Sequence, residues 1–387
     1  MLTDISSEQW YRRVIIFDYF IKVQYMKKNK TFLYTFVFIS FISAMSCNDP
    51  VFYTIYKEPP KIDPLVKGSP TNFVGFDGYM YVASGKTLYW YIDGQWAYNN
   101  PVDYRIIQLA ATPSYIYLLC NSDNDESLES KIFYKGTSGD WTELSGFGDY
   151  KKHKTIYTAD DILYIGTQHK DKDITYEVLR CSGAVVEQTP YITETSILYG
   201  AAYSGTTTFI CTKKTVYADT AAIGTGDYVG IIKLHDGTAA VLAYSGELFT
   251  ADGTSLTSVV PKFSDERRAT GAIAVWKEDI NAASGNSRLL VGRGDISYST
   301  SSGYIHGYVE LQLSDAGGIE GTSYDDPGGT NSSIRDYQSY ASSLGVNPIN
   351  SIFQAPNGIL FAATQKNGVF SYKHRNDGTG EAWNAED

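Results

Sequence analysis

Short apolar runs alternate with turn residues along most of this 387-residue chain. The clearest unit is 357–372, where Asn357-Gly358 opens a run of mostly apolar residues and 366–368 opens a second, β-rich run. Asn-Gly favours a tight hairpin because both central positions of a type I′ turn need positive φ. The same order follows six other turns, which are Asp77-Gly78, Thr112-Pro113-Ser114, Asp160-Asp161, Ser204-Gly205, Asp236-Gly237 and Gly285-Asn286. The pattern therefore predicts seven copies of a double hairpin.

Each copy is predicted to hold four short strands. The first strands are expected at 72–76, 106–110, 155–158, 197–202, 229–234, 272–276 and 349–353. The third strands are expected at 87–91, 131–134, 174–178, 215–217, 247–249, 295–298 and 369–372. Near its end the second strand carries a small residue, which is Ala83, Cys120, Gly166, Cys211, Ala243, Gly292 or Thr364. An outer fourth strand carries a Trp in three copies, at Trp96, Trp141 and Trp383.

These repeats predict an all-β fold, a seven-bladed β-propeller of four-stranded antiparallel blades over 71–387, with an insertion at 314–348. Small residues suit strands that crowd around the central axis of such a ring. A β-sandwich with regular hairpins is the alternative, and seven copies in register favour the propeller. Cys120 and Cys211 occupy the same position of two copies, so we expect small buried residues rather than a disulfide or metal ligands.

The front of the chain carries an export pattern. Residues 26–30 are positively charged, 31–45 form an apolar run, and small residues precede Cys47. This pattern resembles a bacterial lipoprotein signal peptide over 26–46, in the relaxed form seen in spirochaetal lipoproteins, with Ala44 where the strict motif has Leu. The resemblance implies export, removal of residues up to Ser46 and acyl chains on Cys47 that attach the protein to a membrane. An uncleaved anchor helix is the alternative, and it also places the protein at a membrane.

Two segments flank this signal. Residues 1–25 are interpreted as an over-extended reading frame, with Met26 as the true start. Residues 47–70 contain five prolines, a density that resists helix and central strand, so we predict an extended tether. Within the tether, 51–56 could add one strand to the edge of a blade.

The charge balance excludes some partners. The chain has a net charge of −11, and without residues 1–46 it keeps 26 basic and 40 acidic residues, a net charge of −14. Nucleic-acid binding relies on Lys and Arg that neutralise phosphates, so we expect no nucleic-acid partner. The same charge argues against electrostatic adhesion to anionic lipid and leaves the acyl chains as the anchor.

Motifs for catalysis are weak. The five His residues are scattered without metal-ligand spacing and are expected at the surface or in turns. The sequence contains no nucleophile elbow, phosphate loop or dinucleotide fingerprint, so we expect no cofactor. Residues 137–141, 250–253 and 376–383 faintly resemble the structural turns of sialidase blades. Pairing of carboxylates is a spatial property, so a propeller enzyme acting on glycans stays the alternative function.

The longer loops are predicted at one end of the ring, where second–third turns and blade-to-blade connections lie. Loops on a rigid scaffold often carry function. The binding candidates are Asp123, Asp125, Glu126, His169, Arg293, Asp295, Asp325, Asp326, Tyr337 and Tyr340. The first three could share a Ca²⁺, although EF-hand spacing is missing. Arg293-Gly294-Asp295 is either an exposed integrin-binding motif or simply a turn followed by the next strand.

We therefore expect an exported, lipid-anchored and monomeric propeller that acts as a binding or scaffolding module of the cell envelope. Its protein or glycan partner is predicted to contact the face that bears 314–348. A periplasmic assembly scaffold, like the lipoprotein propellers of outer-membrane machinery, is a further alternative. A deep funnel lined by two carboxylates a few ångströms apart would favour the enzyme, whereas a shallow mouth of Tyr and Ser would favour binding.

Overall fold

The computed structural model describes residues 65–121, 130–169, 175–263, 268–277, 280, 287–294, 307–324, 344, 348–365, 367–374 and 381–386. The chain divides into two units, Met1–Lys61 and Ile62–Asp387, and all described residues belong to the second. The predicted signal peptide, Cys47 and the strand expected at 51–56 therefore lie outside the described residues.

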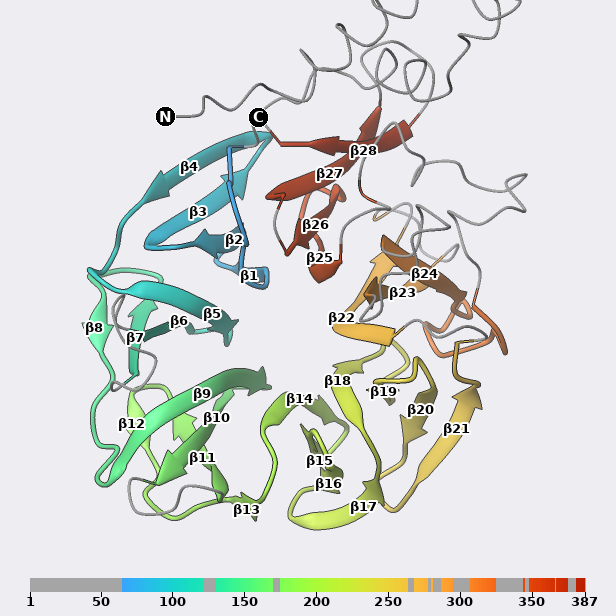
Figure 1. Ribbon diagram of the computed structural model, residues 1–387, viewed down its shortest axis with the longest axis horizontal. Helices are drawn as coiled ribbons and strands as arrows, with labels where there is room; N and C mark the ends of the chain where they lie inside the picture. Colours follow the sequence, from blue (N-terminus) through green and yellow to red (C-terminus); the bar gives the residue numbers. More distant parts are fainter. Residues whose placement is uncertain are drawn as a thin grey trace, which may run out of the picture. The chain divides into compact units, whose positions relative to one another are not determined.

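Seven antiparallel sheets surround a central axis and confirm the predicted seven-bladed β-propeller (Figure 1). Blades 1 and 2 contain β1 (Val74–Phe76), β2 (Tyr79–Ser84), β3 (Thr87–Ile92), β4 (Gln95–Asn99), β5 (Arg105–Ala111), β6 (Tyr115–Asn121), β7 (Lys131–Gly136) and β8 (Thr142–Glu143). Blades 3 and 4 contain β9 (Tyr150–Ala159), β10 (Ile162–His169), β11 (Tyr176–Ser182), β12 (Val185–Val186), β13 (Ile192–Glu194), β14 (Leu198–Ser204), β15 (Thr207–Thr212), β16 (Thr215–Ala218) and β17 (Ala221–Thr225).

Three further blades complete the ring. They contain β18 (Tyr228–Lys233), β19 (Ala239–Ala243), β20 (Leu248–Ala251), β21 (Leu256–Val260), β22 (Arg268–Lys277), β23 (Ser287–Gly294), β24 (Gly307–Gln312), β25 (Ile349–Gln354), β26 (Leu360–Thr364), β27 (Val369–His374) and β28 (Glu381–Ala385). The first strand of every blade is innermost. We call the end with first–second and third–fourth turns the turn end, and the opposite end, with second–third turns and blade-to-blade connections, the connection end.

Blade 6 departs from the prediction in its third strand. That strand is β24, downstream of the predicted 295–298, which lies outside the described residues. The first part of the predicted insertion 314–348 also belongs to the blade. Leu313 forms a β-bridge with Ile319, and the backbone N–H of Gly321 donates to the Gln312 carbonyl (3.2 Å). The Tyr324 hydroxyl then donates to the Gly246 carbonyl (2.8 Å), so this segment runs back to the connection end.

Aspartates at the turns account for part of the acidic charge. Four of them adopt positive φ, namely Asp77, Asp93, Asp160 and Asp219. Asp tolerates the left-handed region better than most residues because its short side chain can hydrogen-bond locally. At the exposed Asp252, for example, the side chain accepts the backbone N–H groups of Thr254 (2.9 Å) and Ser255 (2.9 Å). These acidic residues are therefore explained by turn geometry.

The core lies between adjacent blades, and the predicted small residues are buried there. A Cβ on Gly166 would stand 2.9 Å from the Leu198 Cβ of blade 4, so the close approach of the blades requires a small residue. Cys120, Cys181 and Cys211 are buried free thiols, which confirms the expectation for Cys120 and Cys211. Burial raises the pKa of Cys120 and of Cys181 to about 12, so these thiols stay protonated.

The ring closes by contacts between blades 1 and 7. All four strands of blade 7 come from the C-terminal part of the chain, from β25 to β28. The backbone N–H of Leu65 donates to the Glu386 carbonyl (2.7 Å), and that of Gly368 donates to the Gly68 carbonyl (3.0 Å). The Trp96 indole N–H donates to Glu386 Oε2 (2.8 Å). Hydrogen bonds across the junction thus hold the two blades together.

Candidate functional site: the central cavity

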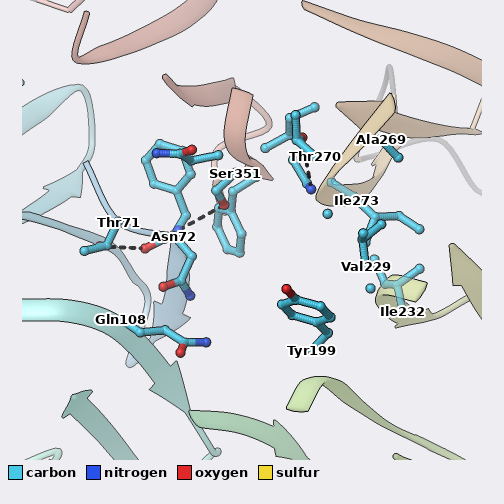
Figure 2. Close-up of a pocket in the computed structure, with 18 of the residues that line it drawn as sticks. Thr71, Asn72, Gln108, Tyr199, Val229, Ile232, Ala269, Thr270, Ile273 and Ser351 are labelled. Carbon is cyan, nitrogen blue, oxygen red and sulfur yellow. Dashed lines mark hydrogen bonds between the residues drawn. The ribbon is translucent and has the colours of Figure 1, made fainter. Parts of the chain in front are cut away.

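A cavity of about 1200 Å³ lies at the centre of the ring. Its lining comes from all seven blades, mainly from the innermost strands β5, β18, β22 and β25 and from residues 69–73 that lead into blade 1. Figure 2 shows Asn72 and Gln108 on one side of the cavity and Val229, Ile232 and Ile273 on the other. The ring of Tyr199 stands between the two sides, so the walls differ in polarity.

A β-bulge recurs near the start of the inner strands and directs side chains toward the axis. The pairing register shifts between Ile106 and Gln108 in β5, Leu198 and Gly200 in β14, Tyr228 and Gly230 in β18, and Ile349 and Ser351 in β25. The residues skipped by these shifts are Ile107, Tyr199, Val229 and Asn350, and all four line the cavity. Bulges re-aim side chains and are frequent beside functional sites.

Side-chain amides bridge some inner strands. Asn72 Nδ2 donates to the Leu109 carbonyl (2.8 Å), and the Leu109 N–H donates back to Asn72 Oδ1 (2.9 Å). Gln108 makes the same pair of hydrogen bonds with the backbone of Ile156, at 2.7 and 3.0 Å. Gln354 repeats it with Lys277, at 2.6 and 3.0 Å. Each amide thus satisfies one N–H and one carbonyl of the neighbouring inner strand.

Cations line both ends of the cavity. Arg105, Lys213 and Arg268 lie at the connection end, Lys233 lies at the turn end, and Asp227 is the one carboxylate among the described lining residues. The Arg268 guanidinium lies over the Tyr244 ring, 5.7 Å from its centroid.

Tyrosines contribute hydroxyl groups to the wall. Tyr157 and Tyr199 come from blades 3 and 4, and Tyr228 and Tyr244 come from blade 5. Burial raises the pKa of the Tyr157 hydroxyl above its ordinary value, so this group stays a hydrogen-bond donor. Ser69 and Ser351 add further hydroxyls. The described part of the lining thus contains four tyrosines and one carboxylate.

Most of the predicted site residues lie outside the described part of the chain. These are Asp123, Asp125, Glu126, Asp295, Asp325, Asp326, Tyr337 and Tyr340. His169 ends strand β10, and its side chain is not described. Arg293 belongs to strand β23 and its side chain is buried, at 1% exposure, so its placement in an exposed turn was wrong. Pairing of Arg293 with Gly307 continues the sheet at this position.

His153 also differs from the expectation of a surface or turn position. It lies in β9 at 3% exposure, its Nδ1 is 3.0 Å from Thr167 Oγ1, and its ring contacts Phe147. Burial lowers the pKa of His153 to about 4. Among the described residues, no group of three His, Cys, Asp or Glu side chains is placed to hold a metal ion. In the same part of the chain, no helix has the length and apolarity needed to cross a membrane.

The cavity residues Arg105, Lys213, Arg268 and Tyr199 were not predicted from the sequence. Their signal was positional: Arg105 directly precedes a predicted inner strand, Tyr199 lies within one, and Lys213 lies in a second–third turn. Arg268 starts the observed inner strand β22, four residues before the predicted strand 272–276. Those places meet at the connection end once the ring closes. The three cations are far apart in the sequence, so only the fold brings them to one cavity.

Comparisons with known proteins support the fold. No family model matches the chain, and no curated protein matches it in sequence. The chain is similar to the GH74 enzyme of Niastella koreensis, with a TM-score of 0.54 and 16% identity over 84% of this chain and 55% of that enzyme. It thus spans about half the length of that enzyme.

Two other solved structures resemble the chain. YCF48 from Cyanidioschyzon merolae gives a TM-score of 0.50 at 7% identity over 79% of this chain and 96% of that one. The WD40 β-propeller domain of Doa1 gives 0.49 at 10% identity, over 81% and 95%. At identities of 16% and 7%, the similarities to the GH74 enzyme and to YCF48 concern the fold alone.

Proposed function

We propose that this protein is an exported propeller, attached to a membrane by acyl chains on Cys47, that binds a protein or glycan partner at the connection end of its ring. The observation that carries the binding role is the cavity of about 1200 Å³, into which all seven blades direct side chains. A closed ring of sheets holds these side chains on a rigid frame, and rigid frames preorganise binding groups.

Several features favour the connection end as the contact face. Arg105, Lys213 and Tyr244 line the cavity there. The described residues that flank the segment 325–347, apart from the single Leu344, are Tyr324 and Pro348, and both lie at that end. Residues 314–324 pack against blade 5, so we assign the partner-binding part of the insertion to 325–347. The predicted contact segment is thereby shortened from 314–348 to 325–347.

The anchor is tested by labelling cells with a clickable fatty acid and isolating the full-length protein. We expect acyl label on the protein and none on the Cys47→Ser variant, because the thiol is the acylation site that the signal pattern implies. Mass spectrometry of the N-terminal peptide would also reveal the residue at which the mature chain begins. Equal labelling of both proteins would refute the anchor. Protease shaving of intact cells separates surface display from a periplasmic scaffold.

The contact face is tested by replacing 325–347 with a short Gly-Ser linker in the full-length protein. We expect loss of partner capture with an unchanged β-sheet spectrum and a cooperative melt. The matched control replaces 281–286, which joins β22 to β23 at the turn end, with the same linker chemistry. Capture that survives the first change, or is lost equally in both variants, would contradict the assignment.

A further inference from the structure

The central cavity is rich in cations although the chain as a whole is acidic. Arg105, Lys213, Lys233 and Arg268 line it, against the single described carboxylate Asp227, in a chain with a net charge of −11. A cleft lined by one sign of charge concentrates ions of the opposite sign. The cavity is therefore suited to an anionic ligand.

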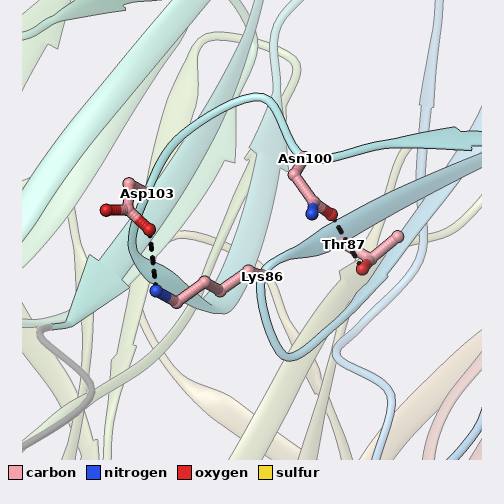
Figure 3. Close-up of polar contacts among 4 residues, drawn as sticks. All are labelled: Lys86, Thr87, Asn100 and Asp103. Atoms are coloured by element: carbon pink, nitrogen blue, oxygen red, sulfur yellow. Dashed lines mark hydrogen bonds and ion pairs between the residues drawn. The ribbon is translucent and has the colours of Figure 1, made fainter.

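A comparison of two neighbouring cations shows which of them are available to a ligand. Lys86 Nζ forms an ion pair with Asp103 Oδ1 at 2.8 Å, and this hydrogen bond lowers the pKa of Asp103 (Figure 3). Arg105 follows Asp103 closely in the chain, lines the cavity and forms no ion pair with a described residue. Lys213 likewise forms no ion pair within the described part of the chain. Arg105 and Lys213 can therefore form ion pairs with a ligand.

The wall between the cations narrows the class of ligand. Val229, Ile232 and Ile273 present aliphatic side chains to the cavity (Figure 2). Ile107 of β5 also lines it. A saccharide would place hydroxyls against them and lose hydrogen bonds to water, which is costly. A peptide can place carboxylates on the cations and apolar side chains on the aliphatic wall. The volume of about 1200 Å³ also exceeds the range of roughly 300–1000 Å³ for small-molecule sites, so several residues fit.

We infer that the cavity binds an acidic peptide segment with interspersed apolar side chains, which enters at the connection end and pairs its carboxylates with Arg105 and Lys213. Charge-assisted hydrogen bonds from Arg to carboxylates are strong and directional, and Arg clusters recognise acidic motifs in other proteins. This inference rests on the proposed binding function and specifies the chemistry of its ligand.

The test uses the full-length protein in detergent and a short fluorescein-labelled peptide that alternates Glu with Leu and Ser. We expect saturable binding by fluorescence anisotropy, which weakens as salt rises because exposed charges are screened. Arg105→Gln and Lys213→Gln should each weaken binding about tenfold or more, since each removes a charged hydrogen-bond donor. The same peptide with Gln in place of Glu should not bind measurably.

Matched controls keep the net charge change and move it out of the cavity. Lys214→Gln alters the residue next to Lys213, and Lys86→Gln alters the cation that Asp103 already neutralises; both should bind the acidic peptide like the unmodified protein. An acidic oligosaccharide, oligogalacturonate, is the competing ligand. Failure of the acidic peptide to bind, equal binding by all four variants, or preferential binding of oligogalacturonate would each overturn the inference. Loss of partner capture on replacing 325–347 would still uphold the proposed function in those cases.

Discussion

The ring joins neighbouring inner strands in two different ways. At the junctions of blades 1–2, 2–3, 6–7 and 7–1, polar side chains span the gap, through Asn72, Gln108, Gln354 and Ser351, whose Oγ accepts the Phe73 N–H at 3.1 Å. We call these the polar-bridged junctions. At the junctions of blades 4–5 and 5–6, glycines allow the strands to touch directly, and we call these the glycine-packed junctions.

At the glycine-packed junctions, an added Cβ would clash with the neighbouring inner strand. A Cβ on Gly200 would stand 2.6 Å from Ile231 Cγ2, and one on Gly271 would stand 2.7 Å from the carbonyl oxygen of Val229. At three of the polar-bridged junctions, an amide side chain of one blade instead satisfies one backbone N–H and one carbonyl of the next blade. In the cavity, Asn72 and Gln108 lie opposite the aliphatic side chains of Val229 and Ile273, so the walls differ in polarity (Figure 2).

The largest expected effect comes from closing the space at a glycine-packed junction. Gly271 has φ of +87° as well as the close approach to Val229, so Gly271→Ala adds backbone strain to a backbone clash. Together these should lower the free energy of unfolding by about 4 kcal/mol, measured by urea denaturation. Gly205→Ala is the control, because Gly205 has φ of +63° with nothing within 4 Å of an added Cβ. It should cost only about 1 kcal/mol. Equal losses would show that packing does not distinguish this junction.

The second effect is a loss of stability in acid. It is expected to start in blade 3, which a polar-bridged junction joins to blade 2. The pKa of buried His153 is about 4 in the folded chain, below its ordinary value of 6.5. Between these values the unfolded chain binds more protons, so stability falls as pH falls through this window, by up to about 3 kcal/mol.

The unfolding free energy should be compared at pH 7 and near pH 4.5 for the unmodified protein and for His153→Gln. The variant removes the titrating ring and should lose less stability in acid, while other titrating groups contribute to both proteins alike. Hydrogen exchange near pH 4.5 should expose β9, which Gln108 bridges, before β18, which lies between the two glycine-packed junctions. Earlier exchange in β18 would show that the glycine-packed junctions are the weaker ones.

The third effect tests the amide bridges themselves. Gln108→Ala leaves the Ile156 N–H and carbonyl without their partners, and an unsatisfied pair at a partly wet cavity wall should cost about 2 kcal/mol. Gln365→Ala is the control, because this exposed amide also lines the cavity but bridges no strands by its side chain; its cost should stay within about 0.5 kcal/mol. Similar costs in urea denaturation would mean that the amides do not hold these junctions.

The hairpin pattern predicted the ring because turn residues and small residues report local backbone geometry. Asp77, Asp160 and the small positions such as Gly166 needed no knowledge of distant contacts. The amide bridges were not predicted, because Gln108 and Gln354 have no sequence feature that distinguishes them from other polar strand residues. Their role depends on the position of a neighbouring blade. The cavity cations were not predicted for the same reason. The outer part of blade 6 was misassigned because its third strand, β24, follows a longer interval than in the other blades.

The smallest expected effect separates the amide bridge from the ion pair at one polar-bridged junction. Lys86 and Asp103 pair on the surface beside the junction of blades 1 and 2 (Figure 3). Asn72 bridges the same junction on the cavity side. Surface pairs contribute little because water and salt screen them. Lys86→Gln should leave the urea midpoint unchanged in low and in high salt. Asn72→Ala, which removes both hydrogen bonds to Leu109, should lower the unfolding free energy by about 1–2 kcal/mol. If Lys86→Gln lowered the free energy of unfolding as much as Asn72→Ala, the surface ion pair would stabilise this junction as strongly as the amide. The junction of blades 1 and 2 could then not be classed as polar-bridged.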